Sequence, residues 1–254
     1  MIEILKAIII GIIQGITEVL PISSSAHNAV IHYVLFKNAI SLTNEIFLHF
    51  SSLIALIIFL RKDIIEFIRN IFKKNFKEPI LLITASIPSF IIYILFDDYF
   101  NLILSNLVFI GFFLIITSLI LLLIYSLLDK ACKENVNYND AFIIGLSQGF
   151  ALIPGISRSG MTLYGALNRE IEYKKAIKFS LFLYLIASSG SVILDYNNLM
   201  NVEINLFSII SFTTTFIFTL ISLYLITNKI KKKHFIYFSL YTLLLGIFTI
   251  IFNL

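Results

Sequence analysis

The chain carries near its start the stretch Gln14-Gly-Ile-Thr-Glu18-Val-Leu-Pro-Ile-Ser-Ser-Ser-Ala-His27. It places a carboxylate, three hydroxyls and an imidazole among Ile, Val and Leu. A second stretch, Pro154-Gly-Ile-Ser-Arg-Ser-Gly160, repeats part of the pattern at a constant shift of 134 positions. The matching residues are Gly11 and Gly145, Gln14 and Gln148, Gly15 and Gly149, Ser23 and Ser157, and Ser25 and Ser159. We therefore expect a functional site where the two copies meet.

The composition indicates a polytopic membrane protein. Of the 254 residues, 59% are hydrophobic and 13% are charged, whereas roughly a quarter of a soluble domain is charged. The single cysteine, Cys132, excludes an internal disulfide framework and offers no metal-ligand spacing. The lysines and arginines are confined to short loops between apolar runs, which is a signal of membrane topology and not of a nucleic-acid surface.

The apolar runs predict an all-α integral membrane protein. Spanning a membrane takes about 20 mostly apolar residues, and six stretches qualify: 43–61, 79–97, 106–128, 177–195, 206–227 and 235–252. Two other apolar regions, 4–36 and 141–168, are interrupted in the middle by Pro, Gly and Ser. One kinked helix is the alternative for each region. Because the interruption occurs twice and is polar both times, paired half-helices that enter the membrane and return are favoured.

The loop charges predict the orientation in a plasma membrane. Sixteen of the 19 basic residues lie in four loops, 61–78, 129–140, 169–178 and 228–234, and none lies in 97–105 or 195–205. With six spans, the basic loops lie in the cytoplasm and both termini lie outside. Three spans separate the two broken regions, which therefore enter from opposite sides. Residues 1–128 and 135–254 are expected to be inverted repeats of a single domain, 1–254, with the site between them near the midplane.

The second copy suggests an anion site. Arg158 is the one basic residue at membrane depth, where an arginine costs at least about 2.5 kcal/mol, so a functional role is the default. The alternative is a structural ion pair with Glu18. A glycine-bounded, serine-rich turn at a helix start presents backbone N–H groups to an anion. The residues expected to bind phosphate with Arg158 are Gly155, Ser157, Ser159 and Gly160.

The first copy offers acid-base and metal chemistry. Gln14 and Glu18 are four apart and share a helix face. Glu18 could act as a general acid or base, or bind a hard divalent cation such as Mg²⁺ or Ca²⁺. His27 could act as base or nucleophile, although a lone histidine in an apolar helix is more often a buried structural residue. Glu45 and His49 form an i,i+4 pair that either faces a metal or is merely interfacial.

These motifs resemble the undecaprenyl-diphosphatase family, also called bacitracin-resistance proteins. The resemblance covers nearly the whole chain. It implies an integral membrane enzyme that hydrolyses a polyprenyl diphosphate to the monophosphate and phosphate and so recycles the lipid carrier of envelope glycans. It also implies dimers, dependence on a divalent cation and a site open towards the outer face. The family's motif residues correspond to Gln14, Glu18, Ser23, Ser24, His27 and Arg158.

The chain departs from the family pattern at four positions. Gln14 stands where Glu is common, Ala26 where Gly is usual, His49 where Gln is usual, and Lys178 where Glu is usual. These departures affect accessory positions and the number of metal ions. They leave Glu18, Ser24, His27 and Arg158 intact.

The sequence thus predicts a membrane lipid-diphosphate phosphatase without a nucleic-acid partner. Arg158 and residues 157–160 would hold the diphosphate, while Glu18 would activate the nucleophile. That nucleophile is Ser24, His27 or a water molecule, with Gln14 and Ser23 as further substrate contacts. The metal ligands would be Glu18, Gln14 and Glu45. The competing function is a flippase for an anionic polyprenyl lipid, because inverted repeats with broken helices are typical of transporters.

Overall fold

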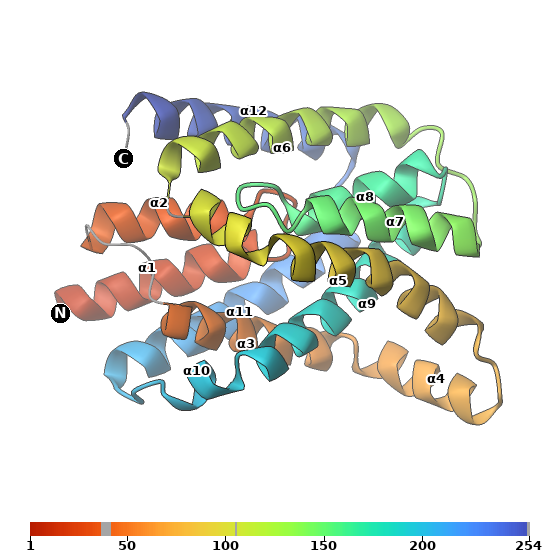
Figure 1. The fold of residues 1–254 in the computed structure, drawn as a ribbon, viewed down its shortest axis with the longest axis horizontal. Coiled ribbons are helices and arrows are strands. Elements are labelled where there is room, and N and C mark those ends of the chain that lie inside the picture. Colours follow the sequence, from red (N-terminus) through yellow and green to blue (C-terminus); the bar gives the residue numbers. More distant parts are fainter. Residues whose placement is uncertain (37–41, 105, 253–254) are drawn as a thin grey trace.

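A computed structural model describes residues 1–36, 42–104 and 106–252, and within these ranges the regular secondary structure is helical (Figure 1). The helices are α1 (Ile2–Thr17), α2 (Ser24–Phe36), α3 (Leu42–Phe59), α4 (Arg61–Phe72), α5 (Lys77–Leu104), α6 (Leu107–Leu127), α7 (Tyr138–Phe150), α8 (Arg158–Asn168), α9 (Tyr173–Leu194), α10 (Tyr196–Met200), α11 (Leu206–Asn228) and α12 (Lys232–Ile251). A single backbone bridge joins Lys133 to Ile171.

Among the described residues, five helices are long and apolar enough to cross a membrane. They are Lys77–Phe96 within α5, α6, α9, α11 and α12, and they coincide with five of the six predicted spans. The sixth predicted span, 43–61, corresponds to α3, whose apolar segment Glu45–Phe59 is shorter than the others. The fold is therefore that of an all-α, multi-pass integral membrane protein.

Both interrupted regions are helical hairpins. Residues 18–23 separate α1 from α2, and residues 151–157 separate α7 from α8. In each pair the second helix packs against the first, so the alternative of one kinked helix is wrong for both regions. Each turn contains a proline, which lacks an N–H, and serines stand where the second helix begins, with Ser157 as the N-cap of α8.

Three loops predicted from charge and hydropathy contain helix instead. The segment 61–78 includes α4, the segment 195–205 includes α10, and α5 continues through 97–105 as far as Leu104, with residue 105 outside the described residues. In α4 the exposed apolar side chains of Ile65, Ile68 and Phe72 recur at helical spacing among charged residues. A short amphipathic helix of this kind lies at a membrane surface and is not a span.

Repeated glycines allow the helices to approach closely at their crossings. A Cβ added to Gly15 of α1 would lie 2.7 Å from the Thr215 carbonyl oxygen of α11. At Gly145 of α7, the matching crossing, a Cβ would collide with the Ala85 backbone of α5. Close backbone approach at small residues is a common way for helices to associate in membranes. The glycines shared by the two copies are therefore explained by packing.

Two opposite ends of the molecule differ in character. The start of α1 and the end of α12 lie at one end, and the basic loops lie towards the other, which also carries α4 (Figure 1). Lys133 and Arg169 from two of these loops form ion pairs with the buried Asp140 at the start of α7. Burial raises the pKa of this carboxyl, but hydrogen bonds from Lys133, the Asn137 amide and Arg169 outweigh burial and hold the pKa below its usual value.

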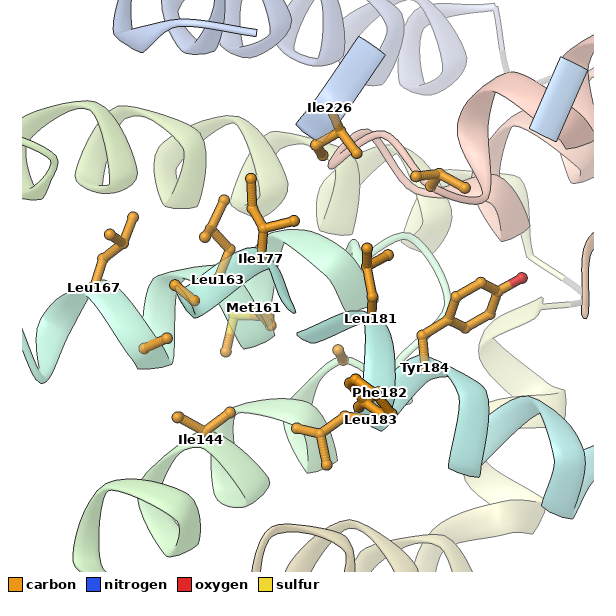
Figure 2. Packing of buried hydrophobic residues seen from close by; sticks show 14 of the residues in the cluster. Ile144, Met161, Leu163, Leu167, Ile177, Leu181, Phe182, Leu183, Tyr184 and Ile226 are labelled. Carbon is orange, nitrogen blue, oxygen red and sulfur yellow. The ribbon is translucent and has the colours of Figure 1, made fainter. Parts of the chain in front are cut away.

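A hydrophobic core lies between α7, α8, α9 and α11. Ile144, Leu163, Leu183 and other apolar side chains fill the space between these helices (Figure 2). Tyr184 lies at the edge of the cluster, and its hydroxyl points away from the other labelled side chains (Figure 2). This core fixes α8 and α9, the two helices that carry the second half of the candidate site.

Candidate active site

The turns of the two hairpins contact each other, as the repeat predicts. The Gly155 amide donates to the Ser25 hydroxyl across 3.3 Å. Thr117 of α6 fixes the second turn, since its hydroxyl donates to the Gly155 carbonyl (2.8 Å) and accepts from the Ser157 amide (3.1 Å). The site is therefore assembled from helices far apart in the sequence.

Each turn contains one residue with left-handed backbone. Ser23 has φ 72° and Gly155 has φ 99°. A Cβ at Gly155 would also lie 2.6 Å from that of Phe113, so this position requires glycine. At Ser23 the conformation is strained, because non-glycine residues rarely adopt it. Strain of this kind is concentrated at functional sites.

The serines shared by the two copies adopt matching arrangements. The Ser23 and Ser25 hydroxyls are 3.3 Å apart, and so are those of Ser157 and Ser159. Ser157 also caps α8 by accepting from the Gly160 amide at 3.2 Å. The start of α8 thus presents hydroxyls and the positive end of the helix dipole beside Arg158.

The centre of the site is an ion pair between the two copies. Arg158 Nη2 lies 2.6 Å from Glu18 Oε1, and Gln14 Nε2 donates to Glu18 Oε2 at 3.1 Å. The Glu18 side chain is only 1% exposed, whereas that of Arg158 is 28% exposed. The carboxylate is thus fixed and buried, while the guanidinium keeps access to a ligand.

Further polar side chains surround Glu18. His49 Nδ1 lies 3.4 Å from Glu18 Oε1, and its Nε2 lies 3.7 Å from Glu45 Oε1. The Ser24 hydroxyl interacts with the same carboxylate. Asn28 Nδ2 donates to the side-chain oxygen Oε1 of Gln14 at 2.5 Å. The carboxylate at position 18 therefore contacts an arginine, a glutamine, a histidine and a serine.

A small cavity of about 30 Å³ adjoins the ion pair. Its polar lining includes Glu18, Arg158, Thr162, Ser180 and Tyr184, and its apolar lining comprises Val19, Leu163, Ile177, Leu181 and Ile226. The Arg158 guanidinium stacks on the Tyr184 ring at 4.4 Å. Polar and apolar walls in one cavity suit a lipid that carries a charged head.

His27 lies apart from this cluster. Its Nδ1 donates to the Ser23 carbonyl at 2.6 Å, so that Nε2 is the acceptor for the Tyr241 hydroxyl at 2.8 Å. The two rings also stack, with centroids 5.5 Å apart. Both ring nitrogens are thus occupied, and the imidazole fixes the strained turn to α12.

The chain matches the family of bacitracin resistance protein BacA over residues 7–248. It belongs to this family. Among curated relatives, it is 38% identical to an undecaprenyl-diphosphatase of Thermosipho africanus over 243 residues, which cover 94% of this chain and 96% of the relative. It is also 38% identical to the undecaprenyl-diphosphatase of Acholeplasma laidlawii and 35% identical to undecaprenyl-diphosphatase 1 of Bacillus cereus, each over 98% of this chain and 97% of the relative.

Most residues predicted from the sequence lie together in this member of the BacA family. Gln14, Ser24 and Arg158 surround the Glu18 carboxylate, and Glu45 is connected to it through His49. The second group lines the two turns: Ser23, Gly155, Ser157, Ser159 and Gly160. His27 is the candidate that the structure places elsewhere.

The sequence reasoning missed Tyr184, Asn28 and Thr117. A signal for Tyr184 was present, because Ser180, Tyr184 and Ser188 recur every fourth residue along an otherwise apolar span. Such spacing places polar groups on one face of a helix. No comparable pattern marks Asn28 or Thr117, whose roles follow from contacts with distant segments.

Proposed function

We propose that this protein hydrolyses undecaprenyl diphosphate to the monophosphate and inorganic phosphate in the plasma membrane. The reaction would recycle the lipid carrier of envelope glycans. The observation that carries the proposal is the Arg158–Glu18 pair at the contact of two serine-rich turns. The similarity to undecaprenyl-diphosphatases over nearly the whole chain supports the substrate.

The diphosphate would bind to Arg158 and to the start of α8. A guanidinium offers two parallel donors to phosphate, and the Ser159 hydroxyl adds a neutral one. The polyprenyl chain would lie against the apolar wall of the cavity, formed in part by Leu181 and Ile226. A phosphate oxygen would reach the partly exposed guanidinium of Arg158 and would then displace the Glu18 carboxylate from it.

That displacement would prepare the nucleophile. Once a phosphate oxygen pairs with Arg158, the Glu18 carboxylate is free to accept the proton of the Ser24 hydroxyl. The Ser24 oxygen would then bond to the terminal phosphorus, and the bond to the bridging oxygen would break, releasing the polyprenyl monophosphate. Water would hydrolyse the phosphoserine and regenerate Ser24. Arg158 would stabilise the phosphoryl charge, which is the main catalytic demand in phosphoryl transfer.

His27 would position the first turn and take no part in proton transfer. Its Nε2 already accepts from Tyr241, and its Nδ1 donates to the Ser23 carbonyl. Ser24 follows Ser23 directly, so a fixed Ser23 carbonyl orients the proposed nucleophile. This role replaces the alternative of His27 as base or nucleophile.

The proposed topology is an inverted repeat with six spans and two re-entrant hairpins. The order α1, α2, α3, α5, α6 in residues 1–128 corresponds to α7, α8, α9, α11, α12 in residues 135–254. The packing supports this correspondence. The contact of α1 with α11 has its counterpart in the contact of α7 with α5. Helices α3 and α9, which correspond to each other, are in contact, and so are the corresponding helices α6 and α12. Both termini would lie outside, the site would open towards the outer face, and the two repeats would form one domain.

A divalent cation, Mg²⁺ or Ca²⁺, would be held by Glu18 with Gln14 or Glu45. The buried Asn28 Oδ1 beside Gln14 has no hydrogen-bond partner, which supports an oxygen-rich ligand set. In the part of the chain that is described, no three His, Cys, Asp or Glu side chains group as a metal site, so substrate oxygens would complete the coordination. When bound, the cation would neutralise phosphate charge. Chelation should therefore lower turnover, and excess Mg²⁺ should restore it.

Phosphate release from undecaprenyl diphosphate by the purified protein tests the function. Wild type should release one phosphate per lipid, whereas Arg158→Ala and Ser24→Ala should release almost none. Lipid movement across vesicles without phosphate release would instead support the competing flippase. Full turnover by Ser24→Ala would exclude the serine nucleophile and leave a water molecule activated by Glu18. Mass spectrometry of the protein in detergent would show whether it forms the homodimer that the family resemblance implies.

A further inference from the structure

Tyr184 of α9 carries a buried hydroxyl group whose proton has no acceptor. The residue is 7% exposed, and no hydrogen bond of normal geometry joins its hydroxyl to any part of the chain that the structure describes. The Glu18 carboxylate and the Ser188 hydroxyl lie near it without completing such a bond. A buried hydroxyl that is left unpaired costs stability, and a role in binding a ligand would explain it.

The Tyr184 ring is fixed against the guanidinium of Arg158. The centre of the ring lies 4.4 Å from the guanidinium carbon, a distance at which a cation is attracted to the face of an aromatic ring. Arg158 in turn pairs with Glu18 at 2.6 Å. The hydroxyl at the edge of this ring therefore lies beside the two charged groups on which the proposed reaction depends.

Helix α9 presents Tyr184, and not its lysines, to the cavity beside Arg158. Tyr184 and Leu181 line this cavity, and in Figure 2 the Tyr184 hydroxyl points away from the other labelled side chains, which are apolar. Lys175 and Lys178 line a second pocket of about 290 Å³ among the basic loops. An anion in the cavity thus meets one guanidinium and neutral hydroxyl groups.

The acceptor that suits this hydroxyl is an anionic oxygen, because hydrogen bonds to charged acceptors are the stronger ones. The Glu18 carboxylate is already engaged by Arg158 and Gln14. In the proposed reaction, a phosphate oxygen takes the place of Glu18 at Arg158. A phosphate group has several oxygens, so that one can pair with the guanidinium while another accepts from Tyr184.

We propose that Tyr184 is a substrate-binding residue whose hydroxyl donates to a phosphate oxygen of the bound lipid diphosphate. Its ring stacks on Arg158 and holds the guanidinium towards the same group. This inference rests on the proposed function, since the ligand is the substrate of that reaction. The hydroxyl and the ring have separate tasks, which substitutions can separate.

Two measurements on the full-length protein in detergent test the proposal. One is turnover of undecaprenyl diphosphate, and the other is binding of a polyprenyl methylenediphosphonate, which cannot be hydrolysed at its bridge. Tyr184→Phe keeps the ring and removes the hydroxyl, so kcat/KM should fall about ten- to a hundredfold and diphosphonate affinity about tenfold or more, as expected for one lost hydrogen bond to a charged group. Because an unpaired buried hydroxyl is removed, this variant should melt no lower than wild type.

Tyr173→Phe is the matched control. The Tyr173 hydroxyl is also buried and lacks a hydrogen-bond partner among the described residues, but Tyr173 packs against Phe235 and does not line the cavity. This variant should also melt no lower than wild type, with unchanged turnover and diphosphonate affinity. Tyr184→Leu removes the ring as well, so its kcat/KM should fall further than that of Tyr184→Phe, because Arg158 loses the stacking contact.

The outcomes separate this inference from the proposed function. Wild-type diphosphonate affinity in Tyr184→Phe, whatever its turnover, would overturn the inference, and so would equal losses in Tyr173→Phe. A Tyr184→Phe protein that melts well below wild type would show a structural hydroxyl and would overturn it too. Wild-type protein that binds the diphosphonate but releases no phosphate would count against the proposed function alone, whereas wild-type protein that does neither would overturn both.

Discussion

The ion pair between Glu18 and Arg158 can be tested by a double-mutant cycle that separates stability from catalysis. Arg158→Gln leaves the 1%-exposed Glu18 carboxylate with Gln14, His49 and Ser24 as its partners. Breaking a buried ion pair from one side costs about 3–5 kcal/mol, and these remaining partners place the expected loss near the lower value. Glu18→Gln should cost less, about 1–2 kcal/mol, since Arg158 is partly exposed and can be hydrated.

The double variant, Glu18→Gln/Arg158→Gln, should be close to wild type in stability. A neutral pair avoids both the desolvation of two charges and the unpaired charge of each single variant. In a chain of this size, a stability loss of about 1 kcal/mol lowers the melting temperature by about 2–4 °C. The loss of about 3 kcal/mol expected for Arg158→Gln should therefore lower its melting temperature by about 6–12 °C relative to wild type. Thermal unfolding followed by intrinsic tyrosine fluorescence in detergent measures these differences.

Activity should follow a different order from stability. All three variants should release phosphate at least about 10²–10³-fold more slowly, because each lacks a group that acts on the phosphoryl transition state. A double variant that melts at the sum of the two single losses would refute the coupling between Glu18 and Arg158. A stable double variant with wild-type turnover would refute the catalytic roles of both.

Three other predictions concern the fold and the first turn. Gly15→Ala should destabilise the protein by about 1–3 kcal/mol through overpacking against α11, whereas Gly190→Ala, where an added Cβ has no neighbour within 4 Å, should melt like wild type. Tyr241→Phe keeps the stacking on His27 but removes its hydrogen bond, so kcat should fall about ten- to a hundredfold through misplacement of the turn while KM stays constant; an unchanged kcat would contradict the positioning role. The pKa of Asp140 is lowered in the folded protein. Its stabilising contribution is therefore complete above the unfolded-state pKa of about 3.9 and is lost as pH falls through the lower folded-state pKa. The difference in melting temperature between wild type and Asp140→Asn should shrink below about pH 4, and a difference that stays constant with pH would contradict this.

Much of the fold could be predicted because membrane insertion restricts the sequence strongly. Apolar length marks five spans, and proline with serine marks both hairpin turns. The scan for apolar length missed α4, whose charged and apolar residues alternate around a helix, and it ended α5 too early. Short amphipathic helices lack the continuous apolar run on which such a prediction depends.

The site could be predicted only in part, for a related reason. A buried arginine needs a counter-charge, and Glu18 is the one carboxylate in the opposite turn, so the sequence offered their ion pair as the alternative to a purely functional Arg158. The contacts of His27 with Tyr241 and of Asn28 with Gln14 depend on which helix faces meet. That information is not local in the sequence, which explains why the sequence left the choice between Ser24, His27 and a water molecule open.

Helix α9 is a wall of both pockets. Ile177, Leu181 and Tyr184 line the cavity beside Arg158, whereas Lys175, Lys178 and Phe182 on an adjacent face line the pocket among the basic loops. Because both sets of side chains belong to one helix, the two pockets share a wall. A movement of α9 that changed the lining of one pocket would therefore change the lining of the other as well.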